Sequence, residues 1–130
     1  MRGHIAVILA GVISTSVLLS AAPAHAAELV WIYNKGSSAR GTIDKVNANV
    51  AADDIKKDGR SAVTRWQARD RRGKVIDRDV CIDSHGANNG YKACHVRPRA
   101  YLFISVCTRD FSKDGGYKNC TAWEGFGWVP

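Results

Sequence analysis

The chain has 130 residues, of which 19 are Lys or Arg and 12 are Asp or Glu, giving a formal net charge of +7 at pH 7. This length suits one domain and excludes a two-domain architecture of ordinary size. The positive charge favours anionic partners such as nucleic acid, cell-wall polymers or acidic lipids, and it also fits a protein that charge simply keeps in solution.

The first 26 residues have the pattern of a secretory signal peptide. Arg2 supplies a positive start, residues 5–20 are uncharged and largely apolar, and Ala24-His25-Ala26 is a small-x-small cleavage signal. A membrane anchor is the alternative, but Gly, Ser and Thr dilute the apolar run. We therefore predict a cleaved leader over 1–26, a single secreted, extracellular domain over 27–130, and no stable membrane anchor after cleavage.

Strand-forming segments separated by turn residues follow. β-Branched and aromatic residues predict strands over 28–33 and 42–50, with turn residues at 34–41 between them. Over 61–70, one alternating set holds Trp66 with small residues, while Arg65 and Arg69 fall on the other face. Burial of Trp66 would send both arginines to solvent.

The second half continues the same pattern. Residues 71–74 predict a hairpin turn, and 75–83 the returning strand. Residues 99–110 are apolar on both faces, which predicts a central strand covered on each side. Short strands at this spacing, without a helical period, predict an all-β fold, either a small antiparallel β-sandwich or an open barrel.

The four cysteines bound two similar loops. "CIDSHGANNGYKAC" (81–94) and "CTRDFSKDGGYKNC" (107–120) both end in Gly-Tyr-Lys-x-Cys and carry turn residues near their midpoints. An even cysteine count in an exported chain indicates two disulfides. We predict two disulfide-stapled hairpins, closed by Cys81–Cys94 and Cys107–Cys120, each contributing about 3 kcal/mol. Four cysteines permit three connectivities, and the sequence alone does not exclude the other two.

The run "DIKKDGRSAV" (54–63), with "SHGANN" and the cysteines that follow, resembles the small exported disulfide-bearing proteins of actinobacteria over about residues 54–120. The resemblance implies a secreted, β-sandwich-like domain and no particular activity. Many of those proteins place a cysteine just before the aspartate turn, where this chain has Ala51-Ala52-Asp53. Their disulfide pattern is therefore not carried over.

Two groups of residues are candidate binding surfaces. The stretch 56–78 is rich in Lys and Arg, and its strand and turn present Arg65, Arg69, Arg71 and Arg72. Such a surface could follow an anionic backbone, although Asp58, Asp70, Asp77 and Asp79 could neutralise it. Near the C-terminus, glycines leave the rings of Trp123, Phe126 and Trp128 accessible for sugars or a protein partner, unless the last strand buries them.

No catalytic motif stands out. His85 and His95 could in principle perform acid–base cleavage of RNA, but no spacing rule supports the pair. The chain has no metal-binding cysteine or histidine pair, and its calcium-like run at 54–59 lacks the closing Glu, so we predict no metal and no cofactor. The leading hypothesis is a non-catalytic extracellular binding module whose partner, an anionic polymer or a protein, is undefined. A ribonuclease-like hydrolase and a protease inhibitor acting through residues 82–93 are the alternatives.

Overall fold

The computed structural model describes residues 29–113 and 115–130, so the predicted leader and its cleavage site lie outside the described residues. This described part contains eight strands, and no helix in it is long and apolar enough to cross a membrane. The strands are β1 (Ile32–Tyr33), β2 (Ala39–Asp44), β3 (Asn49–Asp54), β4 (Ser61–Arg69), β5 (Val75–Asp83), β6 (Lys92–His95), β7 (Ala100–Arg109) and β8 (Glu124–Val129).

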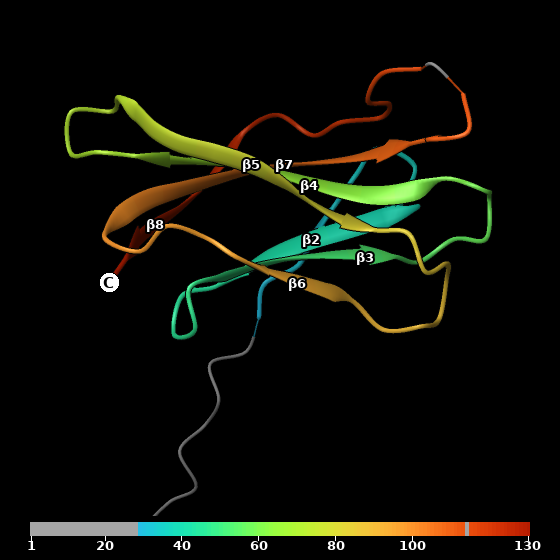
Figure 1. Ribbon diagram of the computed structural model, residues 1–130, viewed down its shortest axis with the longest axis horizontal. Coiled ribbons are helices and arrows are strands. Elements are labelled where there is room, and N and C mark those ends of the chain that lie inside the picture. Colours follow the sequence, from blue (N-terminus) through green and yellow to red (C-terminus); the bar gives the residue numbers. More distant parts are fainter. Residues whose placement is uncertain (1–28, 114) are drawn as a thin grey trace, which may run out of the picture.

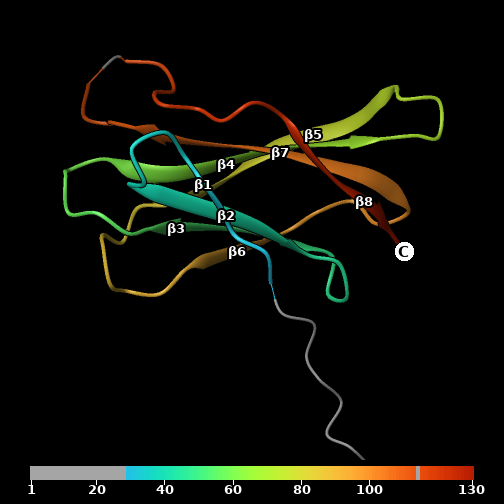
Figure 2. The same ribbon diagram turned by 180° about the vertical axis from the view of Figure 1, so that it is seen from behind.

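The strands form two four-stranded antiparallel sheets that pack face to face as an open sandwich (Figures 1 and 2). Sheet A has the order β1-β2-β3-β6, and sheet B has the order β5-β4-β7-β8. Of the two predicted all-β architectures, the chain adopts the sandwich. Each sheet buries one face against the other sheet. Buried and exposed residues therefore alternate along the strands, and this alternation predicted the long strands well.

The core lies between the sheets and follows the predicted alternation. On β4, the side chains of Ala62, Thr64 and Trp66 face sheet A, and Trp66 is only 4% exposed. On β7, Ile104 and Val106 are paired opposite Trp66 and Thr64 and are fully buried. β7 lies between β4 and β8, as predicted for a central strand.

Gly41 on β2 lies directly against side chains of sheet B. A Cβ atom placed there would lie 2.8 Å from Cγ2 of Val106 and would also overlap the hydroxyl of Thr64. Real side chains do not tolerate such separations, so the glycine is required by packing rather than by backbone conformation.

Two strand predictions near the N-terminus were wrong in their bounds. The expected strand over 28–33 is confined to β1, and residue 28 lies outside the described part. The expected strand over 42–50 is instead the end of β2, a turn and the start of β3. Asp44 makes the turn because its carboxylate accepts the backbone N–H groups of Val46 and Asn47 and the side-chain amide of Asn47.

The predicted disulfide pairing is confirmed, but the first disulfide does not close a hairpin. Cys81 lies on β5 in sheet B and Cys94 on β6 in sheet A, and their Cα atoms are 5.7 Å apart. β5 and β6 are edge strands on the same side of the sandwich, so this disulfide ties the two sheets together. The hairpin prediction failed here because the loop 84–91 crosses from one sheet to the other.

The second disulfide joins a strand of sheet B to an irregular segment. Cys107 is on β7, and Cys120 lies in the segment that returns toward β8, with a Cα–Cα distance of 4.1 Å. Among the described residues, the only strand-like pairing across this loop is a single antiparallel bridge between Thr108 and Lys118. The segment 117–123, here called the strap, therefore depends on the disulfide and on individual hydrogen bonds for its position.

Candidate functional site

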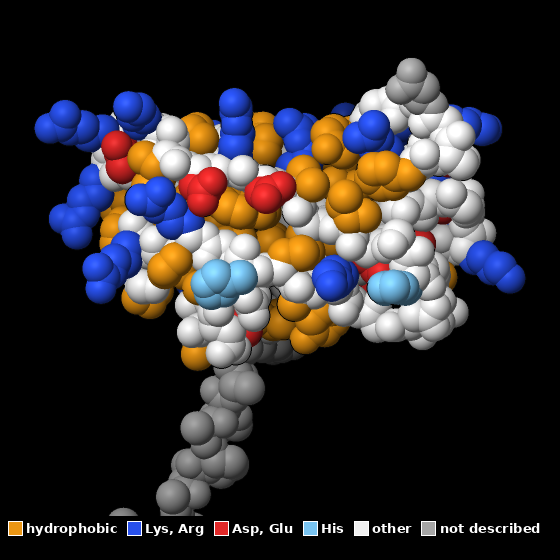
Figure 3. Space-filling model, viewed as in Figure 1, with side chains coloured by type: hydrophobic (Ala, Val, Ile, Leu, Met, Phe, Trp, Pro, Cys, Tyr) orange, Lys and Arg blue, Asp and Glu red, His pale blue; other side chains and the backbone are white. Residues whose placement is uncertain are grey.

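The outward face of sheet B collects most of the residues predicted to bind. Residues paired across a sheet point to the same side, and Arg65 and Arg69 alternate with the buried Trp66. Their cross-strand partners on β7 are Ser105 and Tyr101, so these side chains also face away from sheet A. In Figure 3, basic side chains gather along the upper margin of the molecule, over sheet B, with hydrophobic side chains between them.

At the strap, two arginines share one aromatic ring. The guanidinium carbon of Arg65 lies 4.9 Å from the ring centroid of Trp123 and 5.2 Å from that of Tyr117. The guanidinium carbon of Arg109 lies 5.3 Å from the same Tyr117 ring and 4.7 Å from that of Phe111. The result is a continuous series of alternating rings and cations.

Two further arginines stack on aromatic rings nearer to the β4–β5 turn. The guanidinium carbon of Arg69 lies 4.0 Å from the ring centroid of Phe103, and that of Arg71 lies 5.4 Å from the ring of Trp128. Trp128 also packs edge-on against Tyr101 at 5.1 Å between ring centroids. We call the whole set the arginine–aromatic face: Arg65, Arg69, Arg71, Arg109, Tyr101, Phe103, Phe111, Tyr117, Trp123 and Trp128.

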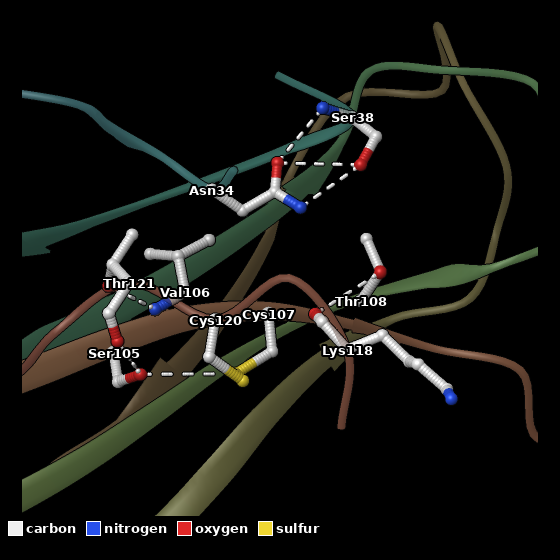
Figure 4. The surroundings of a disulfide bond; sticks show 9 residues. All are labelled: Asn34, Ser38, Ser105, Val106, Cys107, Thr108, Lys118, Cys120 and Thr121. Carbon is white, nitrogen blue, oxygen red and sulfur yellow. Dashed lines mark hydrogen bonds between the residues drawn. A yellow bond between two sulfur atoms is a disulfide. The ribbon is translucent and has the colours of Figure 1, made fainter. Parts of the chain in front are cut away.

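The strap is fixed at both sides of Cys120 (Figure 4). Lys118 exchanges two backbone hydrogen bonds with Thr108, at 2.8 and 2.9 Å. Thr121 binds Val106 through its own N–H and through its hydroxyl, and its carbonyl accepts the hydroxyl of Ser105 at 2.8 Å. The disulfide and these bonds hold Tyr117 and Trp123 over the outward face of sheet B. In Figures 1 and 2, the chain between β7 and β8 runs on the side of sheet B that faces away from sheet A.

The expected neutralisation of the arginines by aspartates is not found in the described residues. Asp58, Asp70, Asp77 and Asp79 each accept a nearby backbone N–H group instead. Asp110, next to Arg109, accepts the hydroxyl and the N–H of Ser112, and the side-chain hydrogen bond from Ser112 is the main cause of its lowered pKa. Ion pairs within 4.0 Å involve none of the four arginines of the face, as far as the described chain extends.

Sheet A provides an internal comparison. There, Arg40 also stacks on an aromatic ring, at 4.3 Å from the centroid of Trp31, and Trp31 packs against Tyr91. However, Nε of Arg40 lies 2.7 Å from a carboxylate oxygen of Asp53, and this hydrogen bond is the main cause of a raised pKa for Arg40. The arginine on sheet A therefore has an acidic partner, whereas the arginines of the face have none among the described residues.

The arginines of the face follow the direction of β4. Arg109 is paired opposite Ser61, so the three arginines Arg109, Arg65 and Arg69 lie level with residues 61, 65 and 69 of β4. At about 3.3 Å per residue, neighbouring arginines in this row are about 13 Å apart along the strand, and the row is about 26 Å long. A row of this kind suits an extended ligand better than a compact one.

A hollow of about 160 Å³ opens at the middle of this row. It is lined by Arg65 and Gln67 of β4, by Arg78 and Val80 of β5, and by the strap rings Tyr117 and Trp123. Asp79 and Trp66 complete its lining. The hollow thus combines aromatic walls, two guanidinium groups and the amide of Gln67.

Two of the predicted binding residues lie apart from the others. Phe126 packs against the core and lines a separate hollow with Val30, Ile43 and Lys45, so it does not join Trp123 and Trp128. Its neighbours Gly125 and Gly127 explain the separation, since β8 has a register shift and a positive φ of 84° at Gly127. Arg72 lies exposed in the turn after β4, and no ring stacks on it among the described residues.

Sequence reasoning missed Arg109, Tyr117, Phe103, Phe111 and Tyr101 as members of the face. Phe103 and Tyr101 could have been found, because they alternate with the buried residues of β7 and β7 pairs with β4. Arg109 and Tyr117 could not, because their contact depends on the path of the strap, and Phe111 joins the face only through Arg109.

The two described histidines do not form a common site. His85 lies in the loop before β6, and His95 is the last residue of β6. They form two separate pale blue patches in Figure 3. His95 lines an open hollow of about 480 Å³ with Asp77, Asp79 and Arg97, and His85 is outside that lining. Within residues 29–113 and 115–130, no group of three or more His, Cys, Asp or Glu side chains could hold a metal ion.

Comparisons of the chain with protein-family models, curated proteins and solved structures found no match, so the functional argument rests on the arginine–aromatic face itself.

Proposed function

We propose that the protein is a secreted, non-catalytic binding module that holds a linear anionic polymer along its arginine–aromatic face. The observation that carries the proposal is the row of ring-stacked arginines without acidic partners on sheet B. The paired cysteines support an extracellular site of action, because disulfides persist in oxidising compartments.

The stacking geometry prepares the arginines for this role. A guanidinium lying on a ring uses its flat face there, and its N–H donors remain in the plane, directed to the sides. These donors can bind two oxygens of a phosphate or sulfate at once. The ring also restricts the long side chain before binding, which reduces the entropy lost when the complex forms.

The proposal is tested with long-chain inorganic polyphosphate, which carries charge and no other recognisable group. Binding is measured by tryptophan fluorescence over a series of salt concentrations. We expect the logarithm of the affinity to fall linearly with the logarithm of salt concentration, because bound counterions are released. Arg65→Gln, Arg69→Gln and Arg109→Gln should each weaken binding about twofold to fivefold, as for exposed ion pairs, and each should reduce the salt slope by about one.

Arg97→Gln is the matched control. Arg97 is exposed and lines the hollow beside His95, away from the arginine–aromatic face. The substitution removes the same charge, so it should change the affinity much less and should leave the salt slope unchanged. Equal effects of Arg65→Gln and Arg97→Gln would mean that the overall charge attracts the polymer and that the face does not bind it.

A further inference from the structure

We infer that the polymer held on this face is a single-stranded nucleic acid, with one base seated in the hollow that Arg65, Tyr117 and Trp123 line. This inference rests on the proposed function and names the ligand of the same face. Its central observation is that aromatic rings and arginines alternate along the row, so that the face offers contacts to flat groups as well as to anions.

The rings remain accessible although arginines stack on most of them. Tyr117, Trp128 and Tyr101 are 37%, 36% and 38% exposed, and Phe111 is 49% exposed. Unpaired bases stack on such rings and on guanidinium planes, while arginines contact the phosphates between them. A polymer that carried only charge would leave these apolar surfaces in water.

The hollow has room for one planar ring. Its volume is about 160 Å³, and an engineered protein cavity of about 150 Å³ accepts benzene. The two strap rings and the guanidinium plane of Arg65 that lies on them provide stacking surfaces. The oxygen of the Gln67 side chain accepts hydrogen bonds from Arg69, and its NH2 group can donate to the polar edge of a base. Arg65 and Arg78 line the same hollow and can contact the phosphates on either side of that base.

The same geometry argues against a double helix as ligand. In a duplex, the flat faces of the bases are stacked on each other, and surface rings cannot reach them without flipping a base out. A sulfated polysaccharide would bind the arginines but has no aromatic base to place in the hollow. Among linear polyanions, the unpaired strand alone uses both components of the face.

The inference is tested by fluorescence anisotropy of the disulfide-bonded protein with two labelled strands. One is a strand of about 12 deoxythymidines, a length within the range of known stacking sites. The other is an abasic strand of the same length and charge. We expect the thymidine strand to bind at least about tenfold more tightly, the factor that stacking of one base provides.

Variants of the two tyrosines then locate the preference. Tyr117 and Tyr91 stand in the same Gly-Tyr-Lys-x-Cys context, but Tyr91 packs on Trp31, which stacks on Arg40 of sheet A. Tyr117→Ala should reduce the thymidine preference about threefold to tenfold. Tyr117→Phe should retain the preference because the ring remains, and Tyr91→Ala should not change it.

Each outcome decides between the two proposals. Equal binding of thymidine and abasic strands would overturn the nucleic-acid inference and leave the polyanion module standing. A preference that Tyr91→Ala reduces as much as Tyr117→Ala does would also overturn it. Failure of both strands and of polyphosphate to bind would overturn the proposed function itself.

Discussion

Asp44 and Asp54 lie at the ends of paired strands, and their environments shift their pKa values in opposite directions. Burial is the main cause of the raised pKa of Asp54, which is 4% exposed and lies near Asp53, Asp58 and Asp83. The side-chain hydrogen bond from Asn47 is the main cause of the lowered pKa of Asp44. A difference in pKa between the unfolded and folded states makes the free energy of unfolding depend on pH. The two carboxylates should therefore change the stability in opposite ways as the pH changes.

We expect Asp54→Asn to stabilise the protein at neutral pH. A raised folded-state pKa means that Asp54 favours the native state only below the unfolded pKa of about 3.9, and this contribution is lost as pH rises through the folded pKa. Asparagine keeps an oxygen that can accept the backbone N–H of Lys56. Thermal unfolding should therefore show a higher Tm at neutral pH and little difference near pH 3.

Asp44→Asn is the opposite control. The lowered pKa of Asp44 gives stability above its unfolded pKa, and this stability is lost as pH falls through the folded pKa. The variant should lower the Tm at neutral pH, with a smaller effect in acid. The interpretation of Asp54 would be wrong if its substitution lowered the Tm at neutral pH as well.

Gly41 tests the packing between the sheets. Gly41→Ala places a methyl group against Val106 and Thr64, and such overpacking costs about 1–3 kcal/mol. Gly116→Ala is a suitable control, because nothing lies within 4 Å of a Cβ there and its φ is not in the left-handed region. Urea unfolding of both variants measures the difference. Equal stability of the two would show that the sheets separate readily at Gly41.

At the scale of elements, the two disulfides have equal loop lengths and different consequences. Both join cysteines 13 residues apart, so the loop-entropy treatment gives each about 3 kcal/mol. Cys81–Cys94 ties sheet B to sheet A, whereas Cys107–Cys120 holds the strap against β7. Their stabilising effects should therefore be similar, while their effects on binding should differ.

We expect Cys107→Ala/Cys120→Ala to lose about tenfold or more in affinity for the thymidine strand, because Tyr117 and Trp123 are no longer held over Arg65. Cys81→Ala/Cys94→Ala should lose a comparable amount of stability and keep its affinity, measured well below its Tm. Urea unfolding checks the first quantity and anisotropy the second. Equal losses of affinity in the two variants would contradict the role given to the strap.

The long strands were predictable because their side chains obey one simple rule. β4, its turn at 71–74, β5 and β7 all lie where alternation and turn residues predicted them. The β2–β3 hairpin was not, because its turn depends on one carboxylate, that of Asp44, and its strands are rich in alanine. Local polar capping leaves little trace in an apolar pattern.

At the scale of the whole molecule, the disulfides show what local sequence patterns can predict and what they cannot. Equal spacing and shared turn residues predicted the two pairs, and both pairs are present. Whether a loop stays in one sheet or crosses to the other depends on long-range pairing, here of β6 with β3. Half of the candidate site was predictable from the sequence, namely Arg65, Arg69, Arg71, Trp123 and Trp128. The other half depends on the pairing of β7 with β4 or on the path of the strap.

Because Cys120 lies in the strap, the proposed binding depends on whether its disulfide has formed. Under the proposed secretion, the newly made chain would carry four thiols in the reducing cytoplasm, because disulfides form in an oxidising compartment. Under the proposed function, such a precursor would lack the ordered strap and would have low affinity for the transcripts around it. Oxidation would then act as the maturation step that activates the protein, at a point where the RNA of the producing cell is out of reach.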